Sequence, residues 1–249
     1  VIGDANQIIG GIEGAGRGWI MLMESLAAGR AISLPSQCAG GAKACLTVAS
    51  CYSTVRRQFG VAIGKFEGIE EPIARVTGTT YWMEACRRFT AGAVNSGHKP
   101  AVVSAMAKYF QTEAARRNIN DIMDVMGGAA ISRGPRNLVA NAYIGTPIGI
   151  TVEGANILTR TMIIFGQGAI RCHPYAYKEV QALLANDGKA FDHNFWGHIG
   201  HVVRNTCRAF LLSITRGRLA SVPSGPCAKW YRKLSWCSAV YAIMADVAM

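Results

Sequence analysis

The stretch Thr151-Val152-Glu153-Gly154-Ala155-Asn156-Ile157-Leu158-Thr159-Arg160 places one carboxylate among apolar residues and follows it with glycine. Poor solvation disfavours the charged form of a carboxylic acid, so a carboxylate in such surroundings is suited to act as a base. Gly154 allows a positive φ or the close approach of a ligand. Asn156 is expected to cap a helix over 157–170. The alternative interpretation of Glu153 is an acidic residue favoured by the dipole of that helix.

The remaining sequence has the composition of a helical protein with a large apolar core. Half of the 249 residues are apolar, which is enough for one core or for one domain with an extension. Because the sequence begins with Val1 and shows no signal peptide, we expect an excised fragment. No apolar run reaches the length of a membrane span. The eight cysteines lack C-x-x-C spacing, so we expect reduced, buried thiols rather than disulfides or metal ligands.

Apolar periodicity predicts an all-α fold, an antiparallel four-helix bundle with a further C-terminal helical extension. The bundle helices are expected over 19–57 with an interruption near Pro35, and over 67–95, 101–126 and 157–170. Val103, Met106 and Phe110 should form part of the apolar face of the third helix. Residues 129–150 should be an irregular connection with a short helix near 138–144. Strand-like alternation is almost absent between 19 and 171.

Three regions follow from this pattern. Residues 1–18 form a glycine-rich linker that lacks a complete phosphate-binding motif, residues 19–174 form the bundle, and residues 175–249 form a basic extension. The extension should contain helices near 175–185, 191–216 and 228–249. Its last 49 residues carry seven basic side chains against one acidic residue: Arg204, Arg208, Arg216, Arg218, Lys229, Arg232 and Lys233 against Asp246. Such a face favours anionic partners, namely CoA phosphates, anionic lipids or an acidic protein. No recognition motif accompanies the charge, so nucleic acid is not an expected partner.

Histidines also gather in the extension. His193, His198 and His201 lie within nine residues, and the last two share a helical face. Two histidines without a carboxylate or a third ligand make a poor metal site. We therefore expect packing or surface histidines and no metal.

The residues from Val152 to Arg160 resemble the catalytic-base loop of the acyl-CoA dehydrogenases. Their continuation, Ile163-Ile164-Phe165-Gly166-Gln167-Gly168-Ala169-Ile170-Arg171-Cys172-His173-Pro174, is similar to the large bacterial members that act in fatty-acid β-oxidation. This resemblance implies that Glu153 removes the α-proton of an acyl-CoA thioester. A hydride then leaves the β-carbon for the flavin of FAD.

Two further motifs resemble the FAD contacts of that family. Arg56-Arg57-Gln58-Phe59-Gly60 suits the dipole at a helix end, and the resemblance implies that Arg56 meets the flavin pyrophosphate and that Phe59 lies near the cofactor. Gly127 and Gly128 match backbone groups that meet the ADP half of FAD across a dimer interface, although both also suit a helix C-cap. Gly154 and Asn156 complete the set expected near the cofactor. Three positions depart from the family pattern. The family has glutamine where this sequence has Glu67 and Asp124, and glycine where it has Ala130.

Gly29 and Arg30 narrow the choice of base. One branch of the family takes its base from the residue before a motif arginine, and glycine cannot serve in that role. The resemblance implies that Arg30 helps to position the active-site loop. Glu153 therefore remains the candidate.

The resemblance implies an FAD-dependent dehydrogenase that oxidises long-chain acyl-CoA to trans-2-enoyl-CoA and passes electrons to an electron-transferring flavoprotein. It also implies a homodimer or higher oligomer and a cytoplasmic location, with membrane association of the full-length protein left open. The family's N-terminal helical domain and middle β domain have no counterpart in this sequence, so we expect the chain alone to be inactive. Two alternatives stand: an acyl-CoA oxidase of the same superfamily, and a non-catalytic helical module that docks on an anionic membrane or on a protein.

Overall fold

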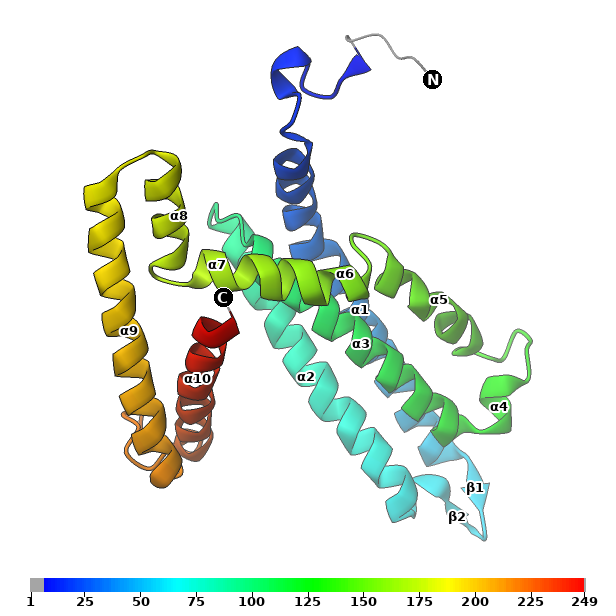
Figure 1. Cartoon of the computed structure of the whole chain (residues 1–249). Helices are drawn as coiled ribbons and strands as arrows, with labels where there is room; N and C mark the ends of the chain where they lie inside the picture. The colour runs from blue at the N-terminus through cyan, green and yellow to red at the C-terminus, as the bar shows by residue number, and fades with distance from the viewer. Residues whose placement is uncertain (1–6, 249) are drawn as a thin grey trace. The chain divides into compact units, whose positions relative to one another are not determined.

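The computed structural model describes residues 7–248, apart from the side chains at positions 23, 27, 28, 162 and 248. These residues form two compact units, one up to Ile164 and one from Phe165 onward (Figure 1). The prediction of an all-α fold is confirmed. Strands are limited, in the described part, to a short hairpin of β1 (Arg57–Gln58) and β2 (Val61–Ala62).

The first unit is built on three long antiparallel helices. They are α1 (Gly18–Val55), α2 (Glu67–Asn95) and α3 (Ala101–Met126), and α1 packs against both of the others (Figure 1). The predicted bounds of α2 and α3 are confirmed. Short 3-10 turns precede α1 (η2, Ile12–Gly14) and α2 (η3, Ile63–Lys65).

The predicted interruption of the first helix at Pro35 is wrong, because α1 continues through this residue. Proline has no N–H, so the carbonyl oxygen of Ala31, four residues earlier, lacks its helical donor. The hydroxyl of Thr90 on α2 donates to that oxygen at 2.7 Å, and Thr90 is fully buried. A contact from the neighbouring helix thus replaces the hydrogen bond that Pro35 cannot make.

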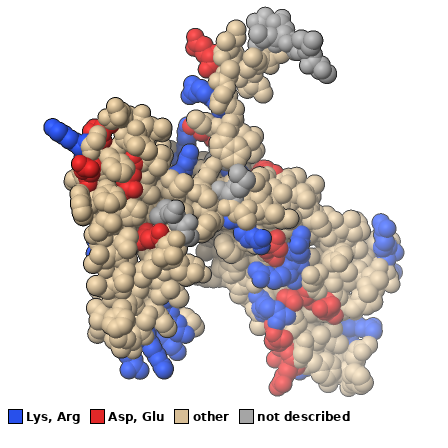
Figure 2. Space-filling view, viewed as in Figure 1, with Lys and Arg blue, Asp and Glu red and all other residues tan. Residues whose placement is uncertain are grey.

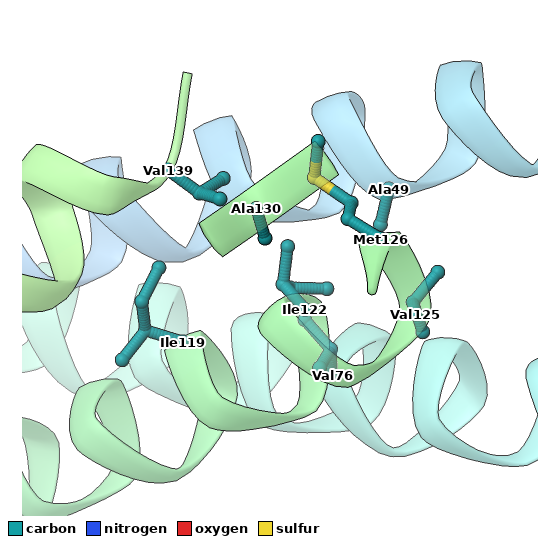
Figure 3. Packing of buried hydrophobic residues seen from close by; sticks show 8 residues of the cluster. All are labelled: Ala49, Val76, Ile119, Ile122, Val125, Met126, Ala130 and Val139. Carbon is teal, nitrogen blue, oxygen red and sulfur yellow. The ribbon is translucent and has the colours of Figure 1, made fainter. Parts of the chain in front are cut away.

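The core of the first unit lies between α1, α2, α3 and the segment that follows α3. Figure 3 shows its buried residues facing one another: Ala49, Val76, Ile119, Ile122, Val125, Met126, Ala130 and Val139. Val103, Met106 and Phe110 are largely exposed instead, so the predicted apolar face of α3 is wrong for these three residues. The buried line of α3 runs through Ala114, Ile119 and Ile122.

The region expected to be irregular is mostly helical. It contains α4 (Gly128–Ile131) and α5 (Ala140–Thr151), and α5 passes through Pro147 and packs on α3. The expected helix over 157–170 is a composite of α6 (Asn156–Leu158), the π-helical run η4 (Thr159–Gln167) and α7 (Gly168–Cys172). Ile163 of this run packs on Ala105 of α3.

The second unit contains α8 (Ala176–Leu184), α9 (Gly188–Ile214) and α10 (Ala228–Ala248). The side chain of Asp187 caps α9 by accepting the N–H of Ala190 at 3.0 Å. Ala209 and Leu212 of α9 pack with Ala239 of α10. Among the described helices, none is by itself long and apolar enough to cross a membrane, whereas one bent pair, α5 with Asn156–Cys172, meets the criteria of length and composition.

None of the eight cysteines forms a disulfide, as the sequence predicts. Their expected burial is wrong for most of them. Cys38 is buried, and burial raises the pKa of its thiol to about 11. Five others are exposed: Cys51, Cys172, Cys207, Cys227 and Cys237.

Candidate active site around Glu153

Glu153 lies in the tight connection between α5 and α6, with its backbone at φ 53°. A positive φ is unusual for a residue with a Cβ, and it persists only where the surroundings enforce it. Gly154 follows at φ 89°, a conformation that suits glycine. Two consecutive left-handed residues reverse the chain sharply, so the direction of the Glu153 side chain is set by the backbone.

Lys108 of α3 holds this loop on both sides of Glu153. Its fully buried ammonium group donates to the carbonyl oxygen of Ile150 at 3.1 Å and to that of Gly154 at 2.7 Å. A third hydrogen bond reaches Oδ1 of Asn156 at 2.7 Å. An ammonium group has three donors, and here each donor has an acceptor. Sequence analysis did not predict that Lys108 holds this loop, because a lysine on a predicted helix is normally solvated.

Asn156 has a different role from the one predicted. The N-cap of α6 is Ala155, and no side chain caps this end, so the capping prediction is wrong. Asn156 is buried, and its amide nitrogen donates to the Thr112 hydroxyl at 3.0 Å and to Oε1 of Glu113 at 2.8 Å. Together with the bond from Lys108, these contacts tie the loop to one face of α3.

The carboxylate of Glu153 faces Gly29 and Arg30 of α1. A Cβ built on Gly29 would lie 3.6 Å from Oε1 of Glu153, so a larger side chain there would crowd the carboxylate. A Cβ on Gly154 would lie 3.7 Å from Nη1 of Arg30, which places this buried guanidinium beside the loop, as the resemblance implies. Oε2 of Glu153 is buried and accepts no hydrogen bond from the residues that the structure describes.

Two cations act electrostatically on the carboxylate. Burial lowers the pKa of Arg30, and the charge of Glu153 opposes that shift. Burial likewise lowers the pKa of Lys108 to about 8, with Glu153 again opposing. The carboxylate of Glu153 is therefore close enough to both cations to interact with them electrostatically.

A pocket of about 350 Å³ lies between α1, α3 and α5. Its walls are mainly apolar or small, and Thr112 and Asn118 contribute polar groups. Gly149 allows α5 to approach α3, because a Cβ at this position would meet Cγ2 of Thr112 at 3.3 Å. The pocket therefore shares Thr112 with the hydrogen bonds that hold the Glu153 loop.

The residues expected near FAD lie at the end of the bundle where α1 and α3 finish and α2 begins. Arg56 follows α1, Phe59 occupies the tip of the hairpin at φ 48°, and Gly127 ends α3 at φ 54° (Figure 1). Phe59 is 92% exposed, and a single edge contact with Phe66, at 6.2 Å between ring centroids, supports it. Gly128, Glu67 and Asp124 are exposed as well. An aromatic ring held outward in this way is suited to meet a cofactor or another chain.

This end is remote from Glu153 within one chain. Helices rise about 1.5 Å per residue, so the part of α1 between Arg30 and Val55 is roughly 37 Å long. The structure therefore brings Glu153, Arg30, Gly154 and Asn156 together and keeps Arg56, Phe59, Gly127 and Gly128 apart from them. Of the three histidines noted in the sequence, His193 is exposed, whereas His198 and His201 are half-buried and lie beside His173 in the second unit.

Comparison with known proteins identifies the family. Residues 16–166 match the family described as acyl-CoA dehydrogenase, C-terminal domain, and residues 170–249 match acyl-CoA dehydrogenase, C-terminal, bacterial type. Because the first match covers more than half of the sequence, the chain belongs to the acyl-CoA dehydrogenase family.

Individual relatives agree with this assignment. Glutaryl-CoA dehydrogenase of Desulfococcus multivorans is 33% identical over 143 residues, which are 55% of this chain and 36% of that protein. Butyryl-CoA dehydrogenase from Megasphaera elsdenii has a similar structure, with a TM-score of 0.54, 28% identity, and coverage of 61% of this chain and 39% of that one. The FAD complex of PigA shares the fold, with a TM-score of 0.56, 23% identity, and coverage of 65% and 40%. The chain thus spans about a third of the length of the curated relatives that it matches.

Proposed function

We propose that this chain supplies the catalytic base, Glu153, to a flavin-dependent acyl-CoA dehydrogenase. The observation that carries the proposal is a half-buried carboxylate held by a left-handed backbone, with one oxygen that has no hydrogen-bond donor among the described residues. Such a group is preorganised to take a proton from a bound substrate. Membership of the acyl-CoA dehydrogenase family supports the reaction class.

In the proposed reaction, Glu153 removes a proton from the α-carbon of an acyl-CoA thioester. FAD, when bound, supplies the acceptor for the hydride that leaves the β-carbon, and the product is a trans-2-enoyl-CoA. Lys108 and Asn156 keep the carboxylate in place, and Gly29 leaves room beside it. The electrons are proposed to pass to an electron-transferring flavoprotein.

We infer that the exposed end of the bundle meets FAD through Arg56, Phe59, Gly127 and Gly128. The outward ring of Phe59 and the glycine conformation of residue 127 fit a surface that a cofactor approaches closely. The roughly 37 Å between Arg30 and Val55 prevents both ends from meeting the same flavin ring. The proposed arrangement is therefore a dimer or higher oligomer in which each bundle contacts two different active sites.

The proposed substrates are long-chain fatty acyl-CoA thioesters of β-oxidation. The resemblance of residues 163–174 to the large bacterial members of the family motivates this proposal. The two relatives named above act on butyryl-CoA and glutaryl-CoA according to their names, so acyl groups differ among relatives at this level of similarity. An acyl-CoA oxidase is the alternative, and rapid reoxidation of the flavin by oxygen with release of peroxide would identify it.

The test of the base uses the full-length enzyme that contains this chain. A long-chain acyl-CoA is titrated anaerobically into wild type and Glu153→Gln, and the flavin absorbance is followed. We expect the variant to bind FAD and ligand while flavin reduction slows by about 10²- to 10⁴-fold or more, the usual contribution of a general base. Asp192→Asn, which changes an exposed carboxylate on α9, is the matched control and should reduce its flavin at the wild-type rate. Bleaching of the Glu153→Gln flavin at the wild-type rate would assign the proton to another group.

A second candidate function is peripheral docking of the second unit on an anionic membrane, with a cytoplasmic location. Figure 2 shows Lys and Arg side chains gathered near the ends of α9 and α10 that are joined by the 215–227 connection. Exposed apolar and aromatic residues accompany them, and Lys233 lies 4.9 Å from the ring centroid of the exposed Trp230. Cations beside exposed aromatic rings suit the lipid headgroup region.

Co-sedimentation with phosphatidylserine vesicles at low salt tests this second candidate. Reversal of charge at Arg232 and Lys233 to Glu should release the protein, because each basic residue near such a surface contributes about 1 kcal/mol. Vesicles of phosphatidylcholine alone are the control and should bind less. Binding that survives both the charge reversal and high salt would exclude electrostatic docking.

A further inference from the structure

Three imidazole rings and a carboxylate come together inside the second unit. His173 follows α7, His198 and His201 belong to α9, and Asp246 belongs to α10. The ring centroid of His173 lies 4.4 Å from that of His198 and 5.0 Å from that of His201. Nε2 of His173 lies 3.1 Å from Oδ1 of Asp246. The cluster therefore joins segments that are up to 73 residues apart in the sequence.

The carboxylate of Asp246 is buried and accepts no hydrogen bond from the described residues. Its side chain is 5% exposed and that of His173 is 6% exposed. Neither carboxylate oxygen of Asp246, nor Nε2 of His173, has a hydrogen-bond partner in the described part of the chain. The 3.1 Å approach between them therefore lacks the alignment of a hydrogen bond. A buried carboxylate in this state is costly unless a cation neutralises it.

Burial lowers the pKa of His173, the neighbouring His198 and His201 lower it further, and Asp246 and Glu179 only partly oppose the shift. Neutral imidazole is the form that binds metal ions.

We propose that His173, His201 and Asp246 bind one divalent first-row transition-metal ion, with zinc as the best match to two nitrogen ligands and one carboxylate. One ligand atom from each residue lies within 4.8 Å of the other two. Modest side-chain movements would bring these atoms to the ligand distances of about 2.0–2.2 Å that are usual for zinc.

His198 is placed to complete the site. Its Nδ1 lies 2.9 Å from Oε1 of Glu179, and its Nε2 lies 4.0 Å from Oδ1 of Asp246. A carboxylate on one ring nitrogen and a metal on the other is the usual arrangement around metal-binding histidines. His198 can therefore approach the same ion as a fourth ligand.

Four existing hydrogen bonds to His173 and His201 limit the expected affinity. Nδ1 of His173 accepts the backbone N–H of Ala176 at 2.9 Å and that of Tyr175 at 3.3 Å, so the neutral ring carries its proton on Nε2, which a metal ion must replace. Both ring nitrogens of His201 already have partners. Its Nε2 lies 2.7 Å from Nδ2 of Asn205, and its Nδ1 lies 3.1 Å from Nη2 of Arg204. One of these two contacts must break before His201 can bind a metal ion. We expect weaker binding than at a site of four preformed thiolate or imidazole ligands.

The test uses the full 249-residue chain, freed of metal with a chelator and titrated with Zn²⁺ by calorimetry. Co²⁺ serves as a spectroscopic probe, because its visible absorption reports the coordination geometry. We expect one ion per chain and a higher melting temperature with metal, since binding to the folded state alone stabilises that state. The proposal is independent of the dehydrogenase function, because neither readout requires flavin or substrate.

Matched variants distinguish metal binding at the cluster from metal binding by exposed residues of the second unit. Asp246→Asn and His201→Gln should each weaken Zn²⁺ binding at least about tenfold, which is the lower end of the effect of even an outer-sphere partner. Asp192→Asn and His193→Gln, both exposed on α9, should bind as wild type does. Wild-type protein that binds no stoichiometric Zn²⁺ or Co²⁺, or variants that bind as tightly as wild type, would overturn the proposal. The wild-type titration decides the matter even where circular dichroism shows that a variant does not fold.

Discussion

Lys108 and Asp246 are both buried charges on long helices, and their surroundings differ in one respect. The ammonium of Lys108 has an acceptor for each of its three donors, whereas the carboxylate oxygens of Asp246 have no donor among the described residues. The first charge is satisfied by its own chain and holds the Glu153 loop in place. The second requires a partner that the described residues do not provide. Satisfied burial thus indicates a positioning role, and unsatisfied burial indicates a binding site.

The largest stability effect is expected where the satisfied charge is removed. Lys108→Met removes the donor to the Ile150 carbonyl and to Oδ1 of Asn156, both in a buried place, and leaves the Gly154 carbonyl with the Thr159 hydroxyl as its donor. We expect the free energy of unfolding to fall by about 3 kcal/mol, since an unsatisfied buried group costs about 1–3 kcal/mol. Urea denaturation of the 249-residue chain measures this loss.

Lys99→Met is the matched control, because Lys99 is exposed and its ion pair with Glu24 is long, at 3.5 Å. It should change stability by less than about 0.5 kcal/mol. Asp246→Asn in metal-free protein should change stability by less than about 1 kcal/mol, because an unpaired buried charge is replaced by a neutral group. Equal losses in Lys108→Met and Asp246→Asn would remove the distinction between the two regions.

A smaller effect is expected from the backbone of the loop itself. Gly154→Ala places a Cβ on a residue at φ 89° and 3.3 Å from Oγ1 of Thr159, so we expect a loss of about 1–2 kcal/mol. Gly29→Ala is the control, because its Cβ meets Oε1 of Glu153 at an ordinary 3.6 Å and alanine favours the helix interior. Thermal melting of both variants compares them. A stable Gly154→Ala variant would show that the loop is not held as described.

The last prediction concerns pH. The pKa of Lys108 is about 8 in the folded chain against an ordinary 10.5, so between these values the unfolded state binds more protons. The free energy of unfolding of wild type, relative to Lys108→Met, should therefore rise with pH from about 8 to 10.5. A neutral amine has only two donors, so amide exchange at residues 150–156 should become faster over the same range. Parallel pH profiles of wild type and the variant would contradict this assignment.

Local signals predicted much of the fold. Gly97, Pro100 and Gly127 mark the ends of α2 and α3, and both helices have the predicted bounds. The interpretation of Pro35 failed because Thr90, on another helix, supplies the missing donor. A hydrogen bond between distant segments leaves no local pattern, so it could not have been foreseen from residue spacing.

In the candidate sites, too, local sequence patterns revealed some residues, and tertiary packing determines the role of the others. Glu153 was found because its loop carries a recognisable pattern, and Lys108 was missed because burial, rather than residue type, gives it its role. The spacing of His198 and His201 was visible in the sequence. The carboxylate of Asp246 reaches them through the packing of α10 on α9, and the ring of His173 reaches them from the turn after α7. Folding alone supplied the ligands that the sequence pattern lacked.

Because α1 continues as one helix through Pro35, the orientation of its first half about the helix axis is fixed relative to that of its second half. A continuous helix turns by about 100° per residue, so the direction of Arg30 beside Glu153 and that of the Arg56–Gly60 hairpin are locked to each other. Substitutions along this helix leave the relative orientation unchanged, whereas the deletion of one residue would rotate one end against the other by more than a quarter turn. Insertions and deletions in α1 should therefore be tolerated less well than substitutions, because only a change of length alters the relative orientation of its two ends.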